Sequence, residues 1–303
     1  MRSTSSSCAS GWPPESAGRR ISSSRCCRRP FPAKPPIPPR EAAVDTPLTK
    51  SPLNVTEIEG GRVVRVALDA GKGNVIDRGA IAALRKTVVE CRGRSSCRAL
   101  LLEHTGPHFS FGASVQEHLP EVVADMLSEF HALARELLEL DTPIVAVVRG
   151  MCLGGGLELA LLADRIVAAP DAVFAQPEIQ LGVFAPLGSA LLPRVVNPHV
   201  AADLLLTGRR VDAREAERMG LTAEVADDPS AAALTWVREH LLPVSAAALR
   251  HATRAARRAW QPGFLAELAD LEAQYTGELM QTNDAREGIT AFLEKRTAHW
   301  EDC

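Results

Sequence analysis

The chain has 303 residues, a formal net charge of −3 at neutral pH, 46 % hydrophobic residues and only 4 % aromatic ones. This is ample apolar material for a core, which must rest mainly on Leu, Val and Ala. The small negative charge argues against a nucleic acid partner, and no uncharged apolar run approaches the roughly 18 residues that a membrane-spanning helix needs.

The first forty residues differ in composition from the rest of the chain. They hold seven Arg and one Lys against a single Glu, and they are rich in Ser and Pro. Such a segment cannot bury enough apolar surface to fold, so residues 1–45 are predicted to be a disordered extension. Three origins stay open: a translation start assigned too far upstream with Val44 as the true first residue, a disordered tail, or a targeting peptide.

Beyond this extension, strand-like and helix-like stretches follow one another. Alternating apolar residues predict a strand at 62–68, and Asp77 is placed to cap a helix that reaches about Cys91. Further strands are predicted at 98–103, 143–148 and 165–169, and helices at 119–140, 154–164, 198–207, 212–219, 231–241, 244–258, 262–281 and 284–296. This order indicates an α/β fold with a helical C-terminal part.

A run of three glycines, residues 154–156, joins the predicted strand at 143–148 to the next helix. Backbone N–H groups at a helix start lack intrahelical partners and carry the positive end of the helix dipole, so they suit an oxygen that gains negative charge. The spacing fits neither a dinucleotide-binding loop nor a P-loop. One turn later Glu158 stands among leucines, where a carboxylate has either a chemical task or a structural ion pair.

A second loop, residues 104–118, follows the strand at 98–103 and offers another backbone N–H beside a small residue. Two such N–H groups from separate strand ends would form a two-pronged oxyanion hole. Glu178 adds a second carboxylate in apolar surroundings. Two nearby carboxylates in a dry pocket cannot comfortably both be ionised, which raises the pKa of one of them and suits acid–base chemistry.

The residues at 109–114, 150–160 and 174–182 resemble the crotonase (enoyl-CoA hydratase/isomerase) superfamily, and the resemblance covers roughly residues 54–297. It implies a crotonase-like spiral of stacked strand–strand–helix turns over residues 46–205 and a helical trimerisation region over 206–303. The assembly it implies is a homotrimer or homohexamer.

The resemblance also implies roles for single residues. The backbone N–H groups of Ala113 and Gly155 would bind a thioester oxygen, and Glu158 and Glu178 would be the two acid/base groups. Which glutamate is the acid and which is the base stays open. The presence of both glutamates disfavours two alternatives. One is a linear enoyl-CoA isomerase, which can work with one carboxylate, and the other is a non-catalytic binding protein on the same fold.

The implied substrate is an acyl-CoA thioester, with CoA bound near Lys72, Asn74 and Lys295; alternatively either lysine is a solvated surface charge. No further cofactor and no metal are expected, and no Cys or His pair has the spacing of a metal site. A cytoplasmic location, without a nucleic acid or membrane partner, is expected.

The segment after Glu178 departs from the common hydratase pattern, because residues 181–193 replace a glycine-rich run with stiffer, apolar residues. In this respect the chain looks like the cyclohexa-1,5-diene-1-carbonyl-CoA hydratases, which add water to a flat ring. Phe109, Phe184 and Pro186 are therefore predicted to contact the substrate. Two alternatives stay open: Phe184 and Pro186 only pack the core, or the substrate is a linear enoyl-CoA.

Overall fold

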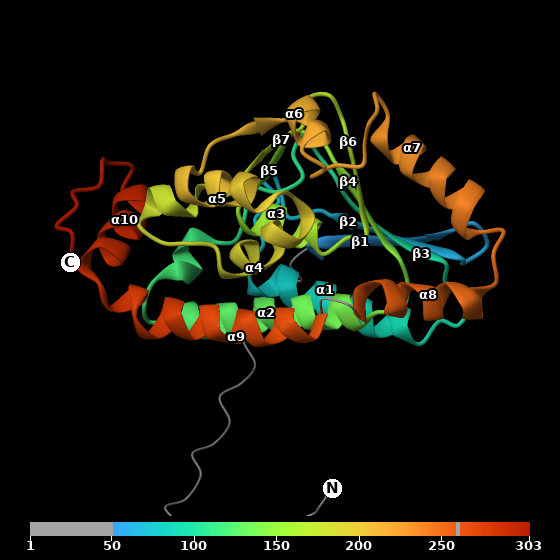
Figure 1. Ribbon diagram of the computed structural model, residues 1–303, viewed down its shortest axis with the longest axis horizontal. Helices are drawn as coiled ribbons and strands as arrows, with labels where there is room; N and C mark the ends of the chain where they lie inside the picture. The colour runs from blue at the N-terminus through green and yellow to red at the C-terminus, as the bar shows by residue number, and fades with distance from the viewer. Residues whose placement is uncertain (1–50, 259–260) are drawn as a thin grey trace, which may run out of the picture. The chain divides into compact units, whose positions relative to one another are not determined.

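The computed structural model describes residues 51–258 and 261–303 (Figure 1), which belong to one compact unit running from Thr49 to Cys303. The predicted extension, residues 1–45, lies outside the described residues, as does Val44. The boundary predicted between residues 205 and 206 falls inside this single unit.

The described strands form two sheets. The larger has the order β1-β2-β3-β4-β6-β9, in which β1 and β2 are antiparallel and all other neighbours are parallel. The smaller has the order β5-β7-β8, in which β5 and β7 are parallel and β8 is antiparallel to β7. The strands are β1 (Leu53–Ile58), β2 (Val63–Leu68), β3 (Ala99–His104), β4 (Ile144–Val148), β5 (Met151–Leu153), β6 (Arg165–Ala168), β7 (Val173–Ala175), β8 (Val211–Asp212) and β9 (Glu224–Val225).

Helices follow most of the strands, and the C-terminal part of the chain is helical (Figure 1). The α-helices are α1 (Arg78–Arg92), α2 (Val123–Glu139), α3 (Gly155–Leu161), α4 (Pro186–Val195), α5 (Pro198–Thr207), α6 (Ala213–Arg218), α7 (Pro229–Trp236), α8 (Ala246–Arg258), α9 (Gln261–Gly277) and α10 (Asn283–Leu293). Shorter helical turns are η1 (Val115–His118), η2 (Pro177–Leu181), η3 (Val237–Leu241) and η4 (Leu279–Gln281). No helix in the described ranges is long and apolar enough to cross a bilayer.

Strand β4 shows why the larger sheet is buried on both faces. Ile144, Ala146 and Val148 pack into the main apolar cluster with α1 and α2, whereas Val145 and Val147 pack into a second cluster with α7. A parallel strand covered on both faces has a continuous run of apolar residues in its sequence. Residues 143–148 show this pattern, from which a buried strand was predicted.

The helix predicted at 119–140 is confirmed as α2 but begins at Val123. Leu119 has an extended backbone, with ψ at 142°, because it precedes Pro120 and the proline ring disfavours a helical conformation there. The four residues before it form the separate turn η1, which lines the functional site described below. Helix α9 packs against α2 and α4 and runs beside α2 in Figure 1, so the C-terminal helices also reach that site.

Candidate active site

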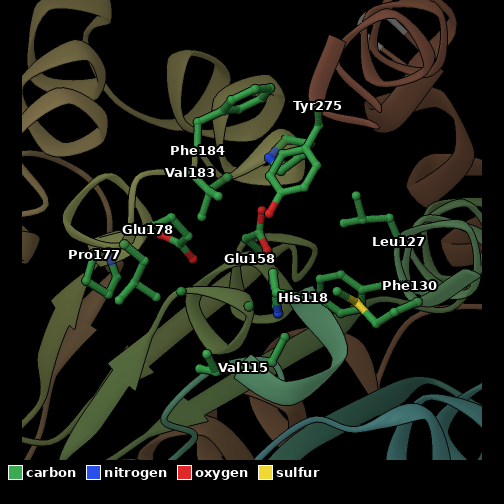
Figure 2. Close-up of a pocket in the computed structure, with 18 of the residues that line it drawn as sticks. Val115, His118, Leu127, Phe130, Glu158, Pro177, Glu178, Val183, Phe184 and Tyr275 are labelled. Atoms are coloured by element: carbon green, nitrogen blue, oxygen red, sulfur yellow. The ribbon is translucent and has the colours of Figure 1, made fainter. Parts of the chain in front are cut away.

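Both predicted glutamates line one largely apolar cavity, which has about 660 Å³ of free space including its mouth. Its walls come from the loop before η1, the start of α3, the turn η2, the start of α4 and helix α9. Figure 2 shows Glu158 and Glu178 directed into the cavity, with the aromatic rings of Phe184 and Tyr275 above them. Two further titratable side chains on its wall, among the described residues, are His118 and Tyr275.

The three glycines that follow β5, namely Gly154 and the first two residues of α3, each permit a close approach. A methyl group on Gly154, whose φ is +50°, would lie 2.4 Å from Oε1 of Glu178. A methyl on Gly155 would lie 2.9 Å from the nitrogen of Ala113, and one on Gly156 would lie 2.7 Å from Cβ of Ser110. The run is therefore needed to bring Glu178 and the loop of Ala113 against the start of α3.

The backbone N–H groups of Ala113 and Gly155 lie side by side at the cavity. The backbone groups of the residues on either side of Ala113 are hydrogen-bonded to Ile76. Ile76 N donates to Gly112 O (2.9 Å), and Ser114 N donates to Ile76 O (3.1 Å). The N–H of Ala113 donates to no other group in the described part of the chain, and Gly155 is the first residue of α3, where N–H groups have no intrahelical partner. The two N–H groups can thus donate hydrogen bonds to one ligand oxygen.

Glu158 lies on the first turn of α3 and is 6 % exposed. Its Oε1 accepts a hydrogen bond of 2.6 Å from the backbone N–H of Gly188, at the start of α4. Burial raises the pKa of Glu158, and hydrogen bonds from the N–H groups of Gly188 and Leu187 partly oppose that rise.

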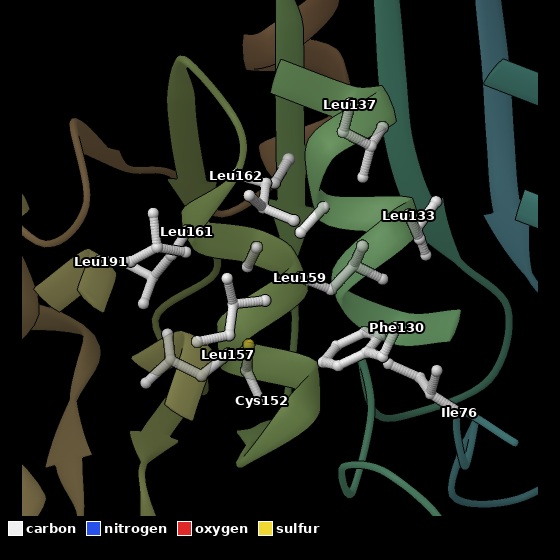
Figure 3. Close-up of a cluster of buried hydrophobic side chains, with 14 of the residues drawn as sticks. Ile76, Phe130, Leu133, Leu137, Cys152, Leu157, Leu159, Leu161, Leu162 and Leu191 are labelled. Carbon is white, nitrogen blue, oxygen red and sulfur yellow. The ribbon is translucent and has the colours of Figure 1, made fainter. Parts of the chain in front are cut away.

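Helix α3 holds Glu158 in place because its leucines are packed on both sides. Figure 3 shows Leu161 beside Leu191 of α4 and Leu159 facing Phe130 of α2. All of these side chains belong to one buried apolar cluster. The carboxylate therefore emerges from a short helix that has little freedom to rotate.

Glu178 lies in the first turn of η2, after strand β7. Its Oε2 is buried and has no hydrogen-bond partner among the described residues. Burial raises its pKa, and the charge of Glu158 raises it further. A carboxyl oxygen without a donor is easier to bury in the protonated state, so Glu178 is the more readily protonated of the two.

His118 enters the cavity from η1, in surroundings that favour its neutral form. Burial lowers the pKa of His118, and its Nδ1 lies 2.8 Å from the carbonyl oxygen of Ser114. The carbonyl can only accept, so Nδ1 carries the proton and Nε2 is an acceptor.

With this geometry in view, the comparisons with known proteins decide the family. Residues 59–303 match the family described as Enoyl-CoA hydratase/isomerase. The chain belongs to the enoyl-CoA hydratase/isomerase family. An enoyl-CoA hydratase structure from Mycobacterium avium superposes with a TM-score of 0.74 and 27 % identity, over 83 % of this chain and all of that one, so the predicted crotonase fold is confirmed.

Two relatives show how similar this chain is in sequence to named hydratases. It is 49 % identical over 252 residues to the cyclohexa-1,5-dienecarbonyl-CoA hydratase of Thauera aromatica, which covers 83 % of this chain and 98 % of the relative. It is 38 % identical over 203 residues to a probable enoyl-CoA hydratase of Mycobacterium tuberculosis, covering 65 % of this chain and 78 % of the relative.

Two of the three residues predicted to contact the substrate line the cavity. Phe184 and Pro186 both line it, and Pro186 is the first residue of α4. The structure does not bring Phe109 there: its ring is fully buried and packs edge-on against His104. Phe111 lines the cavity instead. A regular extended chain would place side chains two residues apart on the same side, so the bend at residue 109 is what separates the two rings.

The residues predicted near CoA lie outside the cavity wall. Asn74 is 1 % exposed, and its amide is fully engaged: Oδ1 accepts from Ala70 N, and Nδ2 donates to the carbonyl oxygens of Thr105 (3.0 Å) and His108 (2.9 Å). This side chain braces two loops and is not free for a ligand. Lys72 and Lys295 are exposed, and neither lines the cavity among the described residues.

Tyr275 was not predicted to belong to the site. It reaches the cavity from α9, far along the sequence from both glutamates, and no local pattern marks it. In the described ranges there is also no group of three or more His, Cys, Asp and Glu side chains placed to hold a metal ion.

Proposed function

We propose that this enzyme adds water to cyclohexa-1,5-diene-1-carbonyl-CoA and gives 6-hydroxycyclohex-1-ene-1-carbonyl-CoA. The observation that carries the proposal is the placement of two carboxyl groups of unequal surroundings and two free backbone N–H groups in one apolar cavity. The Thauera aromatica relative, whose name states this substrate, supports the choice of ring.

In the proposed mechanism the N–H groups of Ala113 and Gly155 bind the thioester oxygen. When water attacks the β-carbon, the electrons of the conjugated diene move onto that oxygen, and the two donors stabilise the resulting dienolate. Removing one such donor typically costs about 2.7–4 kcal/mol of barrier.

The two glutamates take opposite roles. Glu158 accepts the N–H of Gly188, which favours its ionised form, so it removes a proton from the attacking water. Glu178 has an oxygen without a donor and enters protonated, so it delivers its proton to the far carbon of the dienolate. One O–H bond of water breaks, one C–O bond and one C–H bond form as the diene becomes a single alkene, and return of a proton from Glu158 to Glu178 through solvent restores the enzyme.

The ring is favoured over a linear chain by the wall that faces the glutamates. Phe184 packs edge-on against Tyr275, with ring centroids 5.3 Å apart, and Pro186 fixes the start of α4 beside them. Stiff, flat side chains suit a flat six-membered ring better than a flexible chain, whose ordering costs entropy. The second candidate is hydration of a linear enoyl-CoA, favoured by the M. tuberculosis relative.

The same proposal includes the setting of the reaction. CoA is part of the substrate, no further cofactor is needed, and Lys72 and Lys295 are proposed to meet its phosphates. Burial of the Asn74 side chain leaves only the backbone around it for CoA. We further propose a homotrimer or homohexamer in the cytoplasm, without a nucleic acid or membrane partner.

The test is the turnover of the purified full-length chain on cyclohexa-1,5-diene-1-carbonyl-CoA and on crotonyl-CoA, at matched concentrations. We expect kcat/KM to favour the diene by at least about a hundredfold, equivalent to about 2.7 kcal/mol in the transition state. Preference for crotonyl-CoA would replace the ring by a linear substrate, and lack of turnover with both would overturn the hydratase assignment.

A further inference from the structure

Tyr275 is a polar residue of the cavity that the mechanism above does not use. Its side chain is 1 % exposed, and its hydroxyl oxygen is buried without a hydrogen-bond partner among the described residues. Figure 2 shows this hydroxyl directed toward the carboxylate of Glu158. The hydroxyl therefore points at the place where water would be activated.

Packing alone does not account for the hydroxyl. The aromatic ring of Tyr275 meets Phe184 edge-on, with an angle of 66° between the rings, and a phenylalanine would make the same contact. An unpaired buried hydroxyl costs about 1–3 kcal/mol of stability. Its presence is explained if the hydroxyl acquires a partner when a ligand fills the cavity.

The hydroxyl can act only as a donor or acceptor that keeps its proton. Burial raises the pKa of Tyr275, and the charges of Glu178 and then Glu158 raise it further. A phenol held in its neutral form beside a base for water suits a fixed hydrogen-bond donor.

Helix α9 is fixed tightly enough to aim such a donor. Glu272, one turn before Tyr275, binds Nδ1 of the fully buried His131 of α2 at 2.5 Å. The cavity is formed on one side by the same helix α2, so the hydroxyl and the cavity wall share one rigid support.

We propose that Tyr275 is a third catalytic residue, whose hydroxyl donates a hydrogen bond to the oxygen that adds to the acyl group. This inference rests on the proposed hydration. The oxygen is first that of the water, whose proton goes to Glu158, and then that of the product hydroxyl. The hydrogen bond occupies one lone pair and leaves the other directed at the β-carbon. No proton leaves Tyr275, so the proton balance given above is unchanged, and in the reverse direction the same bond assists the departing hydroxide.

The test uses Tyr275→Phe, which removes only the hydroxyl. We expect kcat for the diene to fall at least about tenfold with little change in KM, and Tm to stay the same or rise because an unpaired polar group is lost. Thr276→Val is the matched control: the Thr276 hydroxyl bonds Glu272 O at 2.8 Å within α9, away from the cavity wall, so kcat should not change.

A binding measurement separates contact with the reacting oxygen from a general effect on packing. In a Glu178→Gln background, which lacks the proton donor, the Kd values of 6-hydroxycyclohex-1-ene-1-carbonyl-CoA and cyclohex-1-ene-1-carbonyl-CoA are compared with and without Tyr275→Phe. We expect Tyr275→Phe to raise the Kd of the hydroxylated ligand by a factor at least about five times larger than the factor for the ligand that lacks the hydroxyl.

Each other outcome has a distinct meaning. An equal effect on both ligands, or near-normal kcat in Tyr275→Phe, would overturn the role of Tyr275 and leave the hydration intact. If the protein with Tyr275 itself shows no preference for the hydroxylated ligand and no turnover of the diene, the proposed function fails.

Discussion

Nδ1 of His131, in α2, lies 2.5 Å from Oε2 of Glu272, in α9. The imidazole is fully buried, whereas the carboxylate is partly exposed, so this bond ties a C-terminal helix to the interior of the catalytic core. An imidazole N–H can donate to a carboxylate whether or not the second nitrogen is protonated, so the contact itself does not depend on a charged histidine.

The pair predicts a stability effect with a defined pH dependence. The bond to His131 lowers the pKa of Glu272, and burial partly opposes this shift. A lowered folded-state pKa contributes stability above the unfolded pKa of about 4.3, and this contribution is lost as the pH falls through the folded value. Glu272→Gln should therefore lower Tm at pH 7, and the gap to wild type should close toward pH 3.

The control for this prediction lies on the same helix. Glu267 pairs with Arg194 at 2.8 Å, but its side chain is 45 % exposed, so Glu267→Gln should change Tm little at any pH. A Glu272→Gln gap that stays constant from pH 7 to pH 3 would show that the carboxylate contributes only by packing.

The two glutamates predict a bell-shaped pH profile. Burial raises the pKa of both carboxyls, so the limits of the profile should lie well above the usual carboxyl pKa of about 4.3. Activity should fall toward acid as Glu158 gains a proton and toward alkali as Glu178 loses one. kcat/KM measured against pH should lose its acid limb in Glu158→Gln and its alkaline limb in Glu178→Gln.

The size of these effects is a separate prediction. Each substitution to Gln keeps the shape of the side chain but removes the proton transfer, so kcat should fall at least about 10² while the Kd for a CoA ester changes little. Near-normal turnover in either variant would remove that glutamate from the mechanism.

The oxyanion hole can be blocked by one methyl group. In Gly155→Ala the added Cβ would lie 2.9 Å from the nitrogen of Ala113, beside the space proposed for the thioester oxygen. We expect kcat/KM to fall about 10²–10³, as when one oxyanion donor is lost. Gly277→Ala is the control, since a Cβ there meets nothing within 4 Å; activity equal to that control would exclude the proposed hole.

Local signals allowed part of this structure to be predicted from the sequence. Asp77 caps α1 through a 2.8 Å bond from Ala80 N, and α5 spans the predicted 198–207 because Asn197 caps its start and Gly208 adopts a left-handed conformation at its end. The glycine run marked the start of α3 for a similar reason: only glycine fits so close to Glu178.

Features that depend on tertiary contacts were not predictable. Strands β5 and β7 have three residues each, too few to show a period, and are defined by tertiary pairing, β5 with β7 and β7 also with β8. Whether Phe109 or Phe111 faces the cavity depends on a local bend of the loop at residue 109, because regular alternation would place both rings on the same side. Tyr275 joins the site only through the packing of α9 on α2, to which no residue near it in sequence points.

Arg257 shows how the C-terminal helices become part of the same unit as the sheet. Its side chain is 3 % exposed, and its guanidinium binds both carboxylate oxygens of Asp164, at 2.9 and 2.5 Å. It also donates to the carbonyl oxygens of Leu137 and Leu140, which lie at the end of α2. Asp164 in turn accepts the N–H of Ile144, at the start of β4.

Arg257→Met should therefore be strongly destabilising. It leaves Asp164 and the carbonyl oxygens at the end of α2 without their buried donor, and each buried acceptor left unsatisfied in this way costs about 1–3 kcal/mol. The free energy of unfolding in urea measures the loss. Arg258→Met removes an exposed neighbour on the same helix and should cost less than about 0.5 kcal/mol. An equally small loss of unfolding free energy in both variants would show that Arg257 does not anchor α8 to the core. Solvent or a rearranged α2 would then be satisfying the groups that Arg257 leaves.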